Sequence, residues 1–288
     1  MSTNENMTTI AQQRSFFLFT NGSIMDRQMS DVLGIGLDGV VLRESEFTVL
    51  KIPKLSGTAQ PDGSIKPAEF FEVDKLGLDR EKDVYDRLKG APFVAECLGV
   101  SDFGITLKYY SGGSLEAYMR THQEPSLQLK QRWITQVATA LVHCHEARIL
   151  VADIALRNLL IDEHLNMFMI DFSNSYIFED DAVIADLRQE DYTPKMDMLY
   201  LGSVIYSIVK WCKYSLDCAD ESEWPSLPEL PATKGIPFGH IIHCCWTGQY
   251  DHVTQLHQHV VSHRARNRSK RKSKRVVKAR TEAEVNAI

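Results

Sequence analysis

The chain has 288 residues, 44% hydrophobic and 24% charged, which is ordinary for a globular protein of one large domain or two packed lobes. No apolar run approaches the roughly 18 residues of a membrane span, and the short run at 15–19 is no signal-peptide core, so we expect the cytosol or nucleus. The formal net charge of −6 is uneven, since residues 264–288 hold ten Lys and Arg against two Glu, and residues 1–263 hold 22 Lys and Arg against 36 Asp and Glu. An acidic body of net charge −14 therefore precedes a basic tail of net charge +8.

The first part of the chain is predicted to be rich in strands. Residues 1–14 are polar and are expected to be disordered. From about 33 to 54, β-branched runs flank the polar turn "RESE", which predicts a hairpin. The segment "GIGLDGVV" opens this hairpin, and Lys51 stands at the end of "TVLK". Three glycines of this kind let backbone N–H groups approach anionic oxygens, although a plain glycine-containing hairpin is an equal alternative.

The pattern then changes from strands to helices. Residues 55–67 contain two Gly and two Pro and are predicted to be a loop. Residues 68–89 have a helical period, with Gly77 as a candidate interruption, and residues 93–110 predict two short strands. Later segments are predicted to be helical, namely 127–145, 198–211 and two helices within 238–263. The segment 198–211 is apolar nearly all round, which favours a buried central helix. A strand-rich front and a helix-rich back predict a two-lobed α+β architecture.

Two aspartates stand in a spacing that suggests chemistry. In "VADIALRNLLID", Asp153 is followed five residues later by Asn158 and by an apolar run. In "MIDFS", thirteen residues after Asn158, Asp171 follows a short apolar strand. Each aspartate alone is explained as a turn or cap residue. Two such segments in this order, after a glycine segment and a strand lysine, fit that explanation poorly.

Taken in order, these segments resemble the eukaryotic protein kinase superfamily over roughly residues 28–263. The resemblance implies a two-lobed kinase-like fold, with a small strand-rich N-lobe and a large helical C-lobe. It also implies four parts, which are an N-terminal segment (1–27, partly disordered), the N-lobe with its hinge (28–110), the C-lobe (111–263) and a basic disordered tail (264–288).

The resemblance implies that ATP binds with its phosphates at the glycine segment, which contains Gly34, Gly36, Gly39 and Val41. Lys51 would pair with the α- and β-phosphates. Glu81 on the 68–89 helix would hold Lys51, and Glu72 is the second choice. The segment "ITLKYY" resembles the interlobe hinge. Leu107 would be the gatekeeper, and the backbone of Lys108 and Tyr110 would contact adenine.

The remaining roles fall on the helix-rich part. Asn158 and Asp171 would hold Mg²⁺, the second implied cofactor, and Asp153 would act on the proton of the acceptor hydroxyl. Arg157 matches an arginine of tyrosine kinases and could supply positive charge near the transferred phosphoryl group. Asp197 resembles the aspartate that opens the buried helix and braces the catalytic loop.

The chain departs from the family pattern in four places. Val151 and Ala152 replace the His and Arg before the catalytic aspartate, and Ser173 replaces the Gly of Asp-Phe-Gly. "Tyr192-Thr-Pro194" is the nearest remnant of Ala-Pro-Glu. Because the replaced arginine usually pairs with a phosphate on the activation segment, we predict that phosphorylation there is not the main switch. A serine at a position of positive φ would cost about 1 kcal/mol or more, unless its side chain caps locally.

Three functions remain open. The leading one is a protein kinase that transfers the γ-phosphoryl group of ATP to a Ser, Thr or Tyr hydroxyl of a protein. The second is a pseudokinase that binds nucleotide or partners as a scaffold. The third is a small-molecule kinase of the aminoglycoside type, against which the hinge, Asp197 and "HCCW" speak.

Other chemistry-bearing residues carry weaker signals. Six cysteines without a Cys-x-x-Cys pair predict buried thiols rather than disulfides. The histidines and cysteines of "HIIHCC" match no closed zinc spacing. Cys144-His145 is expected to be a helix end rather than a catalytic dyad. The basic tail fits a nuclear-import signal, a nucleic-acid or membrane-surface patch, an autoinhibitory strand or a solvated disordered tail.

Overall fold

The computed structural model describes residues 15–17, 31–36, 39–54, 56–60, 62, 64–67 and 71–263. The chain divides into two compact units, Met1–Lys82 with Cys97–Tyr109, and Asp83–Glu96 with Tyr110–Ile288. The predicted disorder of residues 1–14 and the basic tail at 264–288 lie outside the described residues. No helix in the described part of the chain is long and apolar enough to cross a membrane.

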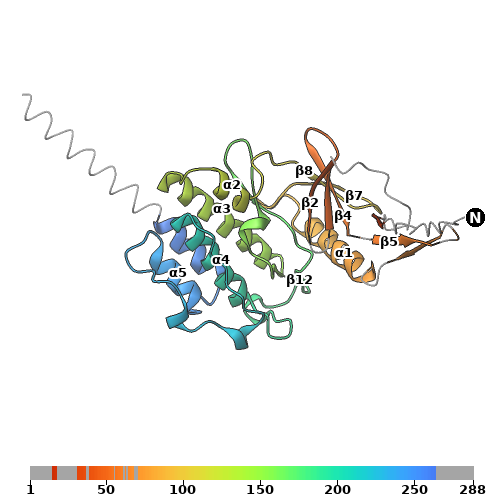
Figure 1. Ribbon diagram of the computed structural model, residues 1–288. Helices are drawn as coiled ribbons and strands as arrows, with labels where there is room; N and C mark the ends of the chain where they lie inside the picture. The colour runs from red at the N-terminus through yellow and green to blue at the C-terminus, as the bar shows by residue number, and fades with distance from the viewer. Residues whose placement is uncertain are drawn as a thin grey trace, which may run out of the picture. The chain divides into compact units, whose positions relative to one another are not determined.

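The first unit contains a five-stranded antiparallel sheet with the order β2-β3-β4-β8-β7 (Figure 1). Its strands are β2 (Val32–Ile35), β3 (Gly39–Arg43), β4 (Thr48–Pro53), β7 (Cys97–Val100) and β8 (Ile105–Lys108). Alternate residues of β3 and β4 form its core, namely Val40, Leu42, Leu50 and Ile52. The predicted hairpin is confirmed, because β3 and β4 pair in antiparallel fashion. In the turn between them, Ser45 Oγ accepts from the Thr48 amide at 3.1 Å.

The loop predicted at 55–67 is wrong. This segment forms β5 (Ser56–Ala59) and β6 (Ile65–Pro67), and β1 (Ser15–Phe17) pairs with β5 to give a three-stranded antiparallel sheet. Asp62 closes the turn, since its carboxylate accepts from the Ser64 amide at 2.9 Å. Pro67 lies at the end of an edge strand, where a missing N–H breaks no ladder bond. Gly57 lies inside β5 and Pro67 ends β6, so neither residue excludes a strand here.

Helix α1 (Phe71–Arg87) runs through Gly77 without a break, so the expected interruption is also wrong. A glycine inside a helix costs about 1 kcal/mol relative to alanine, which neighbouring contacts can offset. The division between the two units falls within this helix, after Lys82.

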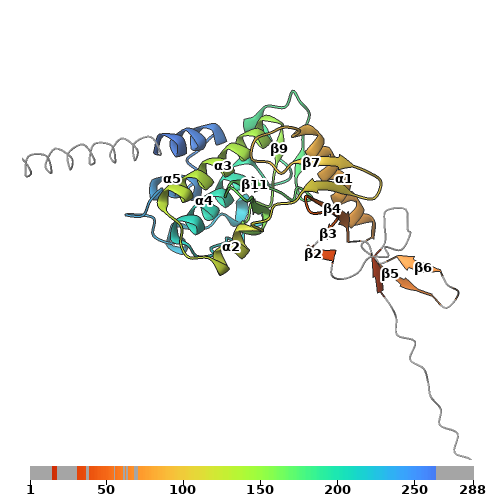
Figure 2. The ribbon, with the colours of Figure 1, turned by 90° about the horizontal axis from the view of Figure 1, so that it is seen from above.

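The second unit is mainly helical, which together with the sheet of the first unit confirms the α+β expectation (Figure 2). Its helices are α2 (Leu115–Thr121), α3 (Leu127–Glu146), α4 (Pro194–Lys210), α5 (Gly239–Trp246) and a last helix at 253–263. Short 3₁₀ turns also occur, η2 (Leu156–Asn158), η3 (Ile184–Asp186), η4 (Glu221–Glu223) and η5 (Leu227–Glu229). Two small antiparallel pairs complete it, β10 (Leu159–Ile161) with β11 (Met167–Met169), and β9 (Ile149–Leu150) with β12 (Tyr176–Ile177).

Helix α4 is the buried central helix that the sequence predicts, and it lies between α3 and α5 (Figure 1). It begins at Pro194, four residues before the predicted start, because proline is preorganised for the first helical position. Gly202 allows α5 to pack closely, since a Cβ there would lie 2.6 Å from Cys245 Cβ. The buried helix α4 thus gives the loops that precede it a fixed element to pack against.

Candidate functional site

Lys51 and Glu81 form a buried ion pair within the first unit. Lys51 Nζ lies 2.5 Å from Glu81 Oε2, and the two side chains are 10% and 0% exposed. Because Leu50 and Ile52 face the core, the alternation of β4 turns Lys51 to the other face of the sheet. Glu81 is the carboxylate that the sequence favours for this lysine.

The glycine segment forms the β2–β3 turn beside this lysine. The Gly36 amide donates to the Gly39 carbonyl at 2.7 Å, while residues 37 and 38 lie outside the described residues. Val41 pairs with Lys51 across β3 and β4, and Gly34 pairs with Val41 across β2 and β3. A Cβ on Gly39 would lie 3.0 Å from Lys51 Cε, so glycine leaves room for the lysine side chain.

The segment predicted to be the hinge begins in β8 and continues to Tyr110. Leu107 is buried and Lys108 ends β8, where it pairs with Thr48. The Tyr110 side chain is also buried, and its hydroxyl accepts from the Glu96 amide at 3.0 Å. Burial raises the pKa of the Tyr110 phenol to about 12, so the ring acts as a neutral structural group here.

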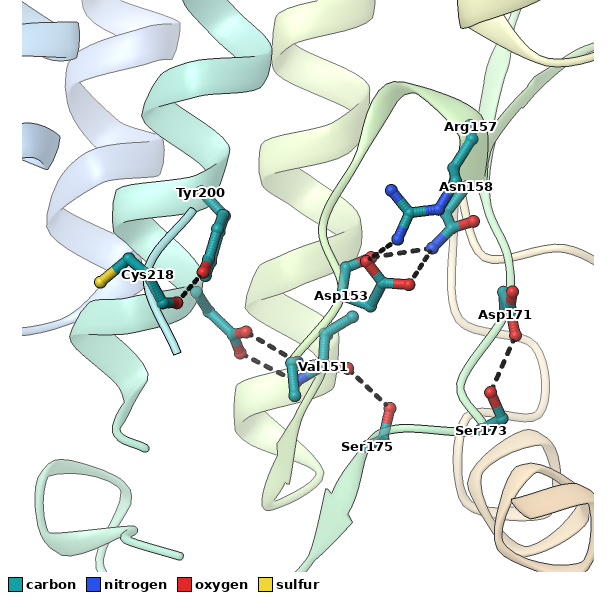
Figure 3. Close-up of polar contacts among 11 residues, drawn as sticks. Val151, Asp153, Arg157, Asn158, Asp171, Ser173, Ser175, Tyr200 and Cys218 are labelled. Atoms are coloured by element: carbon teal, nitrogen blue, oxygen red, sulfur yellow. Dashed lines mark hydrogen bonds and ion pairs between the residues drawn. The ribbon is translucent and has the colours of Figure 1, made fainter. Parts of the chain in front are cut away.

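The residues predicted to form the catalytic loop, Asp153, Arg157 and Asn158, lie together in the second unit. Figure 3 shows the Arg157 and Asn158 side chains directed at the Asp153 carboxylate. Arg157 Nη2 donates to Asp153 Oδ1 at 2.5 Å, and Asn158 Nδ2 donates to Asp153 Oδ2 at 2.9 Å. The single turn η2 brings these residues onto one side of the loop. Two donors therefore fix the orientation of the Asp153 carboxylate.

Asp171 follows β11 and lies next to the backbone of Asn158, because the Ile170 amide donates to the Asn158 carbonyl at 3.0 Å. Asp171 adopts a φ of 67°, which is strained for a residue with a side chain. Ser173 does not have positive φ, so the expected backbone cost at that serine is wrong. Its hydroxyl instead donates to Asp171 Oδ1 at 3.2 Å (Figure 3).

Asp197, in the first turn of α4, accepts hydrogen bonds from the backbone of the loop that precedes Asp153. Its carboxylate is fully buried and receives the Val151 amide at 2.9 Å and the Ala152 amide at 3.0 Å. His145 Nε2 lies 2.9 Å from the same carboxylate, and the Tyr192 hydroxyl donates to it at 2.8 Å. The two residues that depart from the family pattern thus contribute only main-chain donors to this brace. Ala152 takes a φ of 58° to do so.

His145 and Tyr192 are residues that sequence reasoning missed in this role. His145 lies at the end of α3 as predicted, but its ring also reaches the Asp197 carboxylate 52 positions later. Burial, with the Asp197 carboxylate beside it, raises the pKa of the Tyr192 phenol well above its ordinary value. The phenol therefore stays protonated and acts as a donor to Asp197.

A second carboxylate holds the segment that precedes α4. Glu221 accepts from the Thr193 hydroxyl at 2.6 Å through one oxygen and from Arg188 Nη2 at 3.1 Å through the other. The Glu221 amide also donates to the Asp191 carbonyl at 3.3 Å. No signal in the sequence near residue 221 predicts this anchor, which joins two segments about thirty residues apart.

A cavity of about 250 Å³ opens beside Asp153. The catalytic loop from Ala152 to Arg157 forms one wall, and helix α4 with the segment 213–216 forms another. It also has a polar lining that the sequence did not single out, which comprises Glu116, Tyr200, Ser203, Lys213, Tyr214 and Ser215. The cavity is thus lined by Asp153, the residue predicted to act on an acceptor hydroxyl.

None of the cysteines and histidines singled out in the sequence lines this cavity, and the prediction of buried thiols is wrong for Cys212, which is exposed. Burial raises the pKa of the Cys144 thiol, which favours an inert neutral group. In α5, Cys244 Sγ lies 3.7 Å from His240 Nε2 and 3.4 Å from Gln249 Oε1. Within the described residues, no group of three or more His, Cys, Asp and Glu side chains is arranged to hold a metal ion.

Comparison with known proteins identifies the family. A family model described as protein kinase domain matches residues 78–223, about half of the chain. A probable serine/threonine-protein kinase of Dictyostelium discoideum is 24% identical over 264 residues, which cover 82% of this chain and 27% of that protein.

Two fungal relatives are more similar over shorter stretches. The carbon catabolite-derepressing protein kinase of Candida glabrata is 37% identical over 171 residues, which cover 56% of this chain and 28% of that protein. The protein of the same name from Saccharomyces cerevisiae is 37% identical over 144 residues, which cover 48% of this chain and 23% of that protein. The chain spans less than a third of the length of these relatives. On the matched half of its length and the loop geometry above, the chain belongs to the protein kinase domain family.

Proposed function

We propose that this chain is an active protein kinase that transfers the γ-phosphoryl group of Mg-ATP to a hydroxyl group of a protein. One observation carries the proposal. The two altered residues of the catalytic loop, Val151 and Ala152, serve the brace to Asp197 through their amides alone, so their side chains are not needed for it. The side chains of Asp153 and Asn158, which touch the chemistry in the family, are retained and joined to each other.

The residues present suit Mg²⁺ and the phosphates of ATP. Mg²⁺ prefers oxygen ligands, and Asn158 uses its amide nitrogen for Asp153, which leaves its carbonyl oxygen for a metal. Asp171 would supply the carboxylate, and Lys51, held by Glu81, would supply a cation for the phosphates. The metal ion supplies neutralisation of the charge that develops on the phosphoryl oxygens.

Asp153 would accept the proton of the acceptor hydroxyl as the new bond to phosphorus forms. Arg157 and Asn158 hold its carboxylate in place by hydrogen bonds, so that it is oriented to act as the base. The exposed side of the Arg157 guanidinium adds positive charge near the transferred group. The acceptor stays open between Ser, Thr and Tyr.

A nucleotide-binding scaffold is the second candidate, and one observation favours it. Both oxygens of the Asp153 carboxylate are already engaged, one by Arg157 and one by Asn158. If Arg157 keeps its oxygen when substrate binds, it competes with the acceptor hydroxyl for that oxygen and weakens Asp153 as a base. We also propose a cytosolic or nuclear location, which fits the free thiols of all six cysteines. For the basic tail we propose contacts with nucleic acid, importin or acidic surfaces, on the basis of its positive charge alone.

The test is transfer of label from γ-labelled ATP by the purified full chain, with Mg²⁺ or with excess chelator. Generic protein acceptors and a panel of small hydroxyl and amino compounds are supplied in parallel. Mg²⁺-dependent labelling of protein supports the proposal. A chain that melts cooperatively and binds Mg-ATP but labels nothing contradicts it in favour of the scaffold. Labelling of small acceptors alone identifies a small-molecule kinase.

Phosphorylation of Thr193 is predicted not to activate the protein. Thr193 is buried, and its hydroxyl donates to Glu221, so a phosphate there would be repelled by a carboxylate that already binds Arg188 through its other oxygen. Thr193→Glu is therefore expected to lower the melting temperature without raising phosphoryl transfer. Thr193→Ala is expected to cost about 1 kcal/mol of stability and to keep transfer. If Thr193→Ala abolished transfer and Thr193→Glu restored it, the prediction would be wrong.

A further inference from the structure

The cavity beside Asp153 has features that bear on which side chains flank the acceptor residue of a substrate. Its walls come from the catalytic loop, helix α4, Glu116 on α2 and the segment 213–216. The described segment between Asp171 and Thr193, where the family pattern is least preserved, contributes no lining residue. A hydroxyl-bearing methylene group is much smaller than about 250 Å³, since one water occupies about 30 Å³ of liquid. The cavity therefore has room for side chains that flank the acceptor.

Two cations stand at this cavity, and each is more exposed than the carboxylate it contacts. Lys213 Nζ lies 3.0 Å from Glu116 Oε1, with side-chain exposures of 60% and 21%. Arg157 lies 2.5 Å from Asp153, with exposures of 59% and 19%. Approaching groups thus meet the cations before the carboxylates.

The cations also retain free hydrogen-bonding capacity. An Arg side chain has five N–H donors and a Lys side chain has three. Within the described residues, the Arg157 side chain forms its hydrogen bond and ion pair with Asp153 alone, and the Lys213 side chain forms its own with Glu116 alone. Glu116 is further compensated by Arg120, whose Nη1 lies 3.9 Å away. The outer part of the cavity therefore offers unused donors, which suit an anionic group.

Resting on the proposed kinase activity, we infer that this cavity is a subsite for acidic side chains next to the acceptor residue of a protein substrate. Lys213, with the outer N–H groups of Arg157, binds a Glu or Asp that flanks the hydroxyl residue delivered to Asp153. Lys213 is a specificity-determining residue in this assignment. The recognition is short-ranged, because the body as a whole carries a net charge of −14 and repels acidic peptides at a distance.

The experiment compares matched peptides with a Ser, Thr or Tyr acceptor that is flanked either by Glu or by Lys. The wild-type chain is expected to favour the acidic set by about fivefold in kcat/KM, as one exposed ion pair allows. Lys213→Ala brings the ratio of acidic to basic kcat/KM towards one, and Lys213→Glu reverses it, mainly through KM. Lys210→Glu makes the same charge change at an exposed residue outside the cavity and keeps the wild-type ratio.

An unchanged ratio in both Lys213 variants, or a wild-type preference for the basic set, overturns the inference. If the wild type phosphorylates neither set, the proposed activity fails, and binding decides the subsite. Dye-labelled copies of both sets are then titrated with the full chain and followed by fluorescence anisotropy. Tighter binding of the acidic set that is lost in Lys213→Ala supports the subsite, whereas equal binding of both sets refutes it.

Discussion

Asp153→Asn is expected to lower the rate of phosphoryl transfer at saturating Mg-ATP by about 10²- to 10⁴-fold, the contribution of a positioned general base. The amide is nearly isosteric with the carboxylate and its oxygen can still accept from Arg157, while its NH2 group loses the bond from Asn158 at a cost of about 1 kcal/mol. It cannot take the proton of the acceptor hydroxyl. Affinity for Mg-ATP and the melting temperature should therefore change little. Single-turnover labelling and a thermal melt measure the two effects separately.

Asp217→Asn is the matched control, because it removes the same charge from an exposed position outside the cavity lining. It should keep wild-type transfer. Full activity in Asp153→Asn would mean that another group accepts the proton and that the assignment of Asp153 is wrong. A large loss of melting temperature in the same variant would instead assign Asp153 a structural role.

Asp197→Ala is expected to destabilise the second unit by about 3–5 kcal/mol. The side chain is fully buried, and its removal leaves the amides of Val151 and Ala152 and the Tyr192 hydroxyl without their acceptor. Each buried donor that loses its partner costs about 1–3 kcal/mol. For a chain of this size the melting temperature should fall by about 10 °C.

The same change should also impair catalysis below the melting temperature. The left-handed backbone at Ala152 is held by the bond from its amide to Asp197, so the loop is expected to relax when that bond is lost. Transfer should therefore fall in protein that is still folded by circular dichroism. Asp181→Ala, at an exposed position, serves as the control. Wild-type transfer and stability in Asp197→Ala would contradict the bracing role.

The sequence alone determined the local elements and the order of the chemical residues. The β-branched runs on both sides of the polar turn predict the hairpin of β3 and β4. Helical spacing similarly predicts α3 and the burial of α4. The five-residue step from Asp153 to Asn158 brings the two side chains together within one short turn. Each of these depends on neighbours that are close along the chain.

The tertiary structure alone decided what joins distant segments. The pairing of β1 with β5 links residues about forty positions apart, and neither short strand has a strong pattern of its own. His145 meets Asp197 and Glu221 meets Thr193 only because helices α3 and α4 and the segment beyond them fold back on one another. The cavity of Asp153 and Lys213 arises in the same way. Periodicity reports the near neighbours of a residue, whereas such contacts depend on the path of the whole chain.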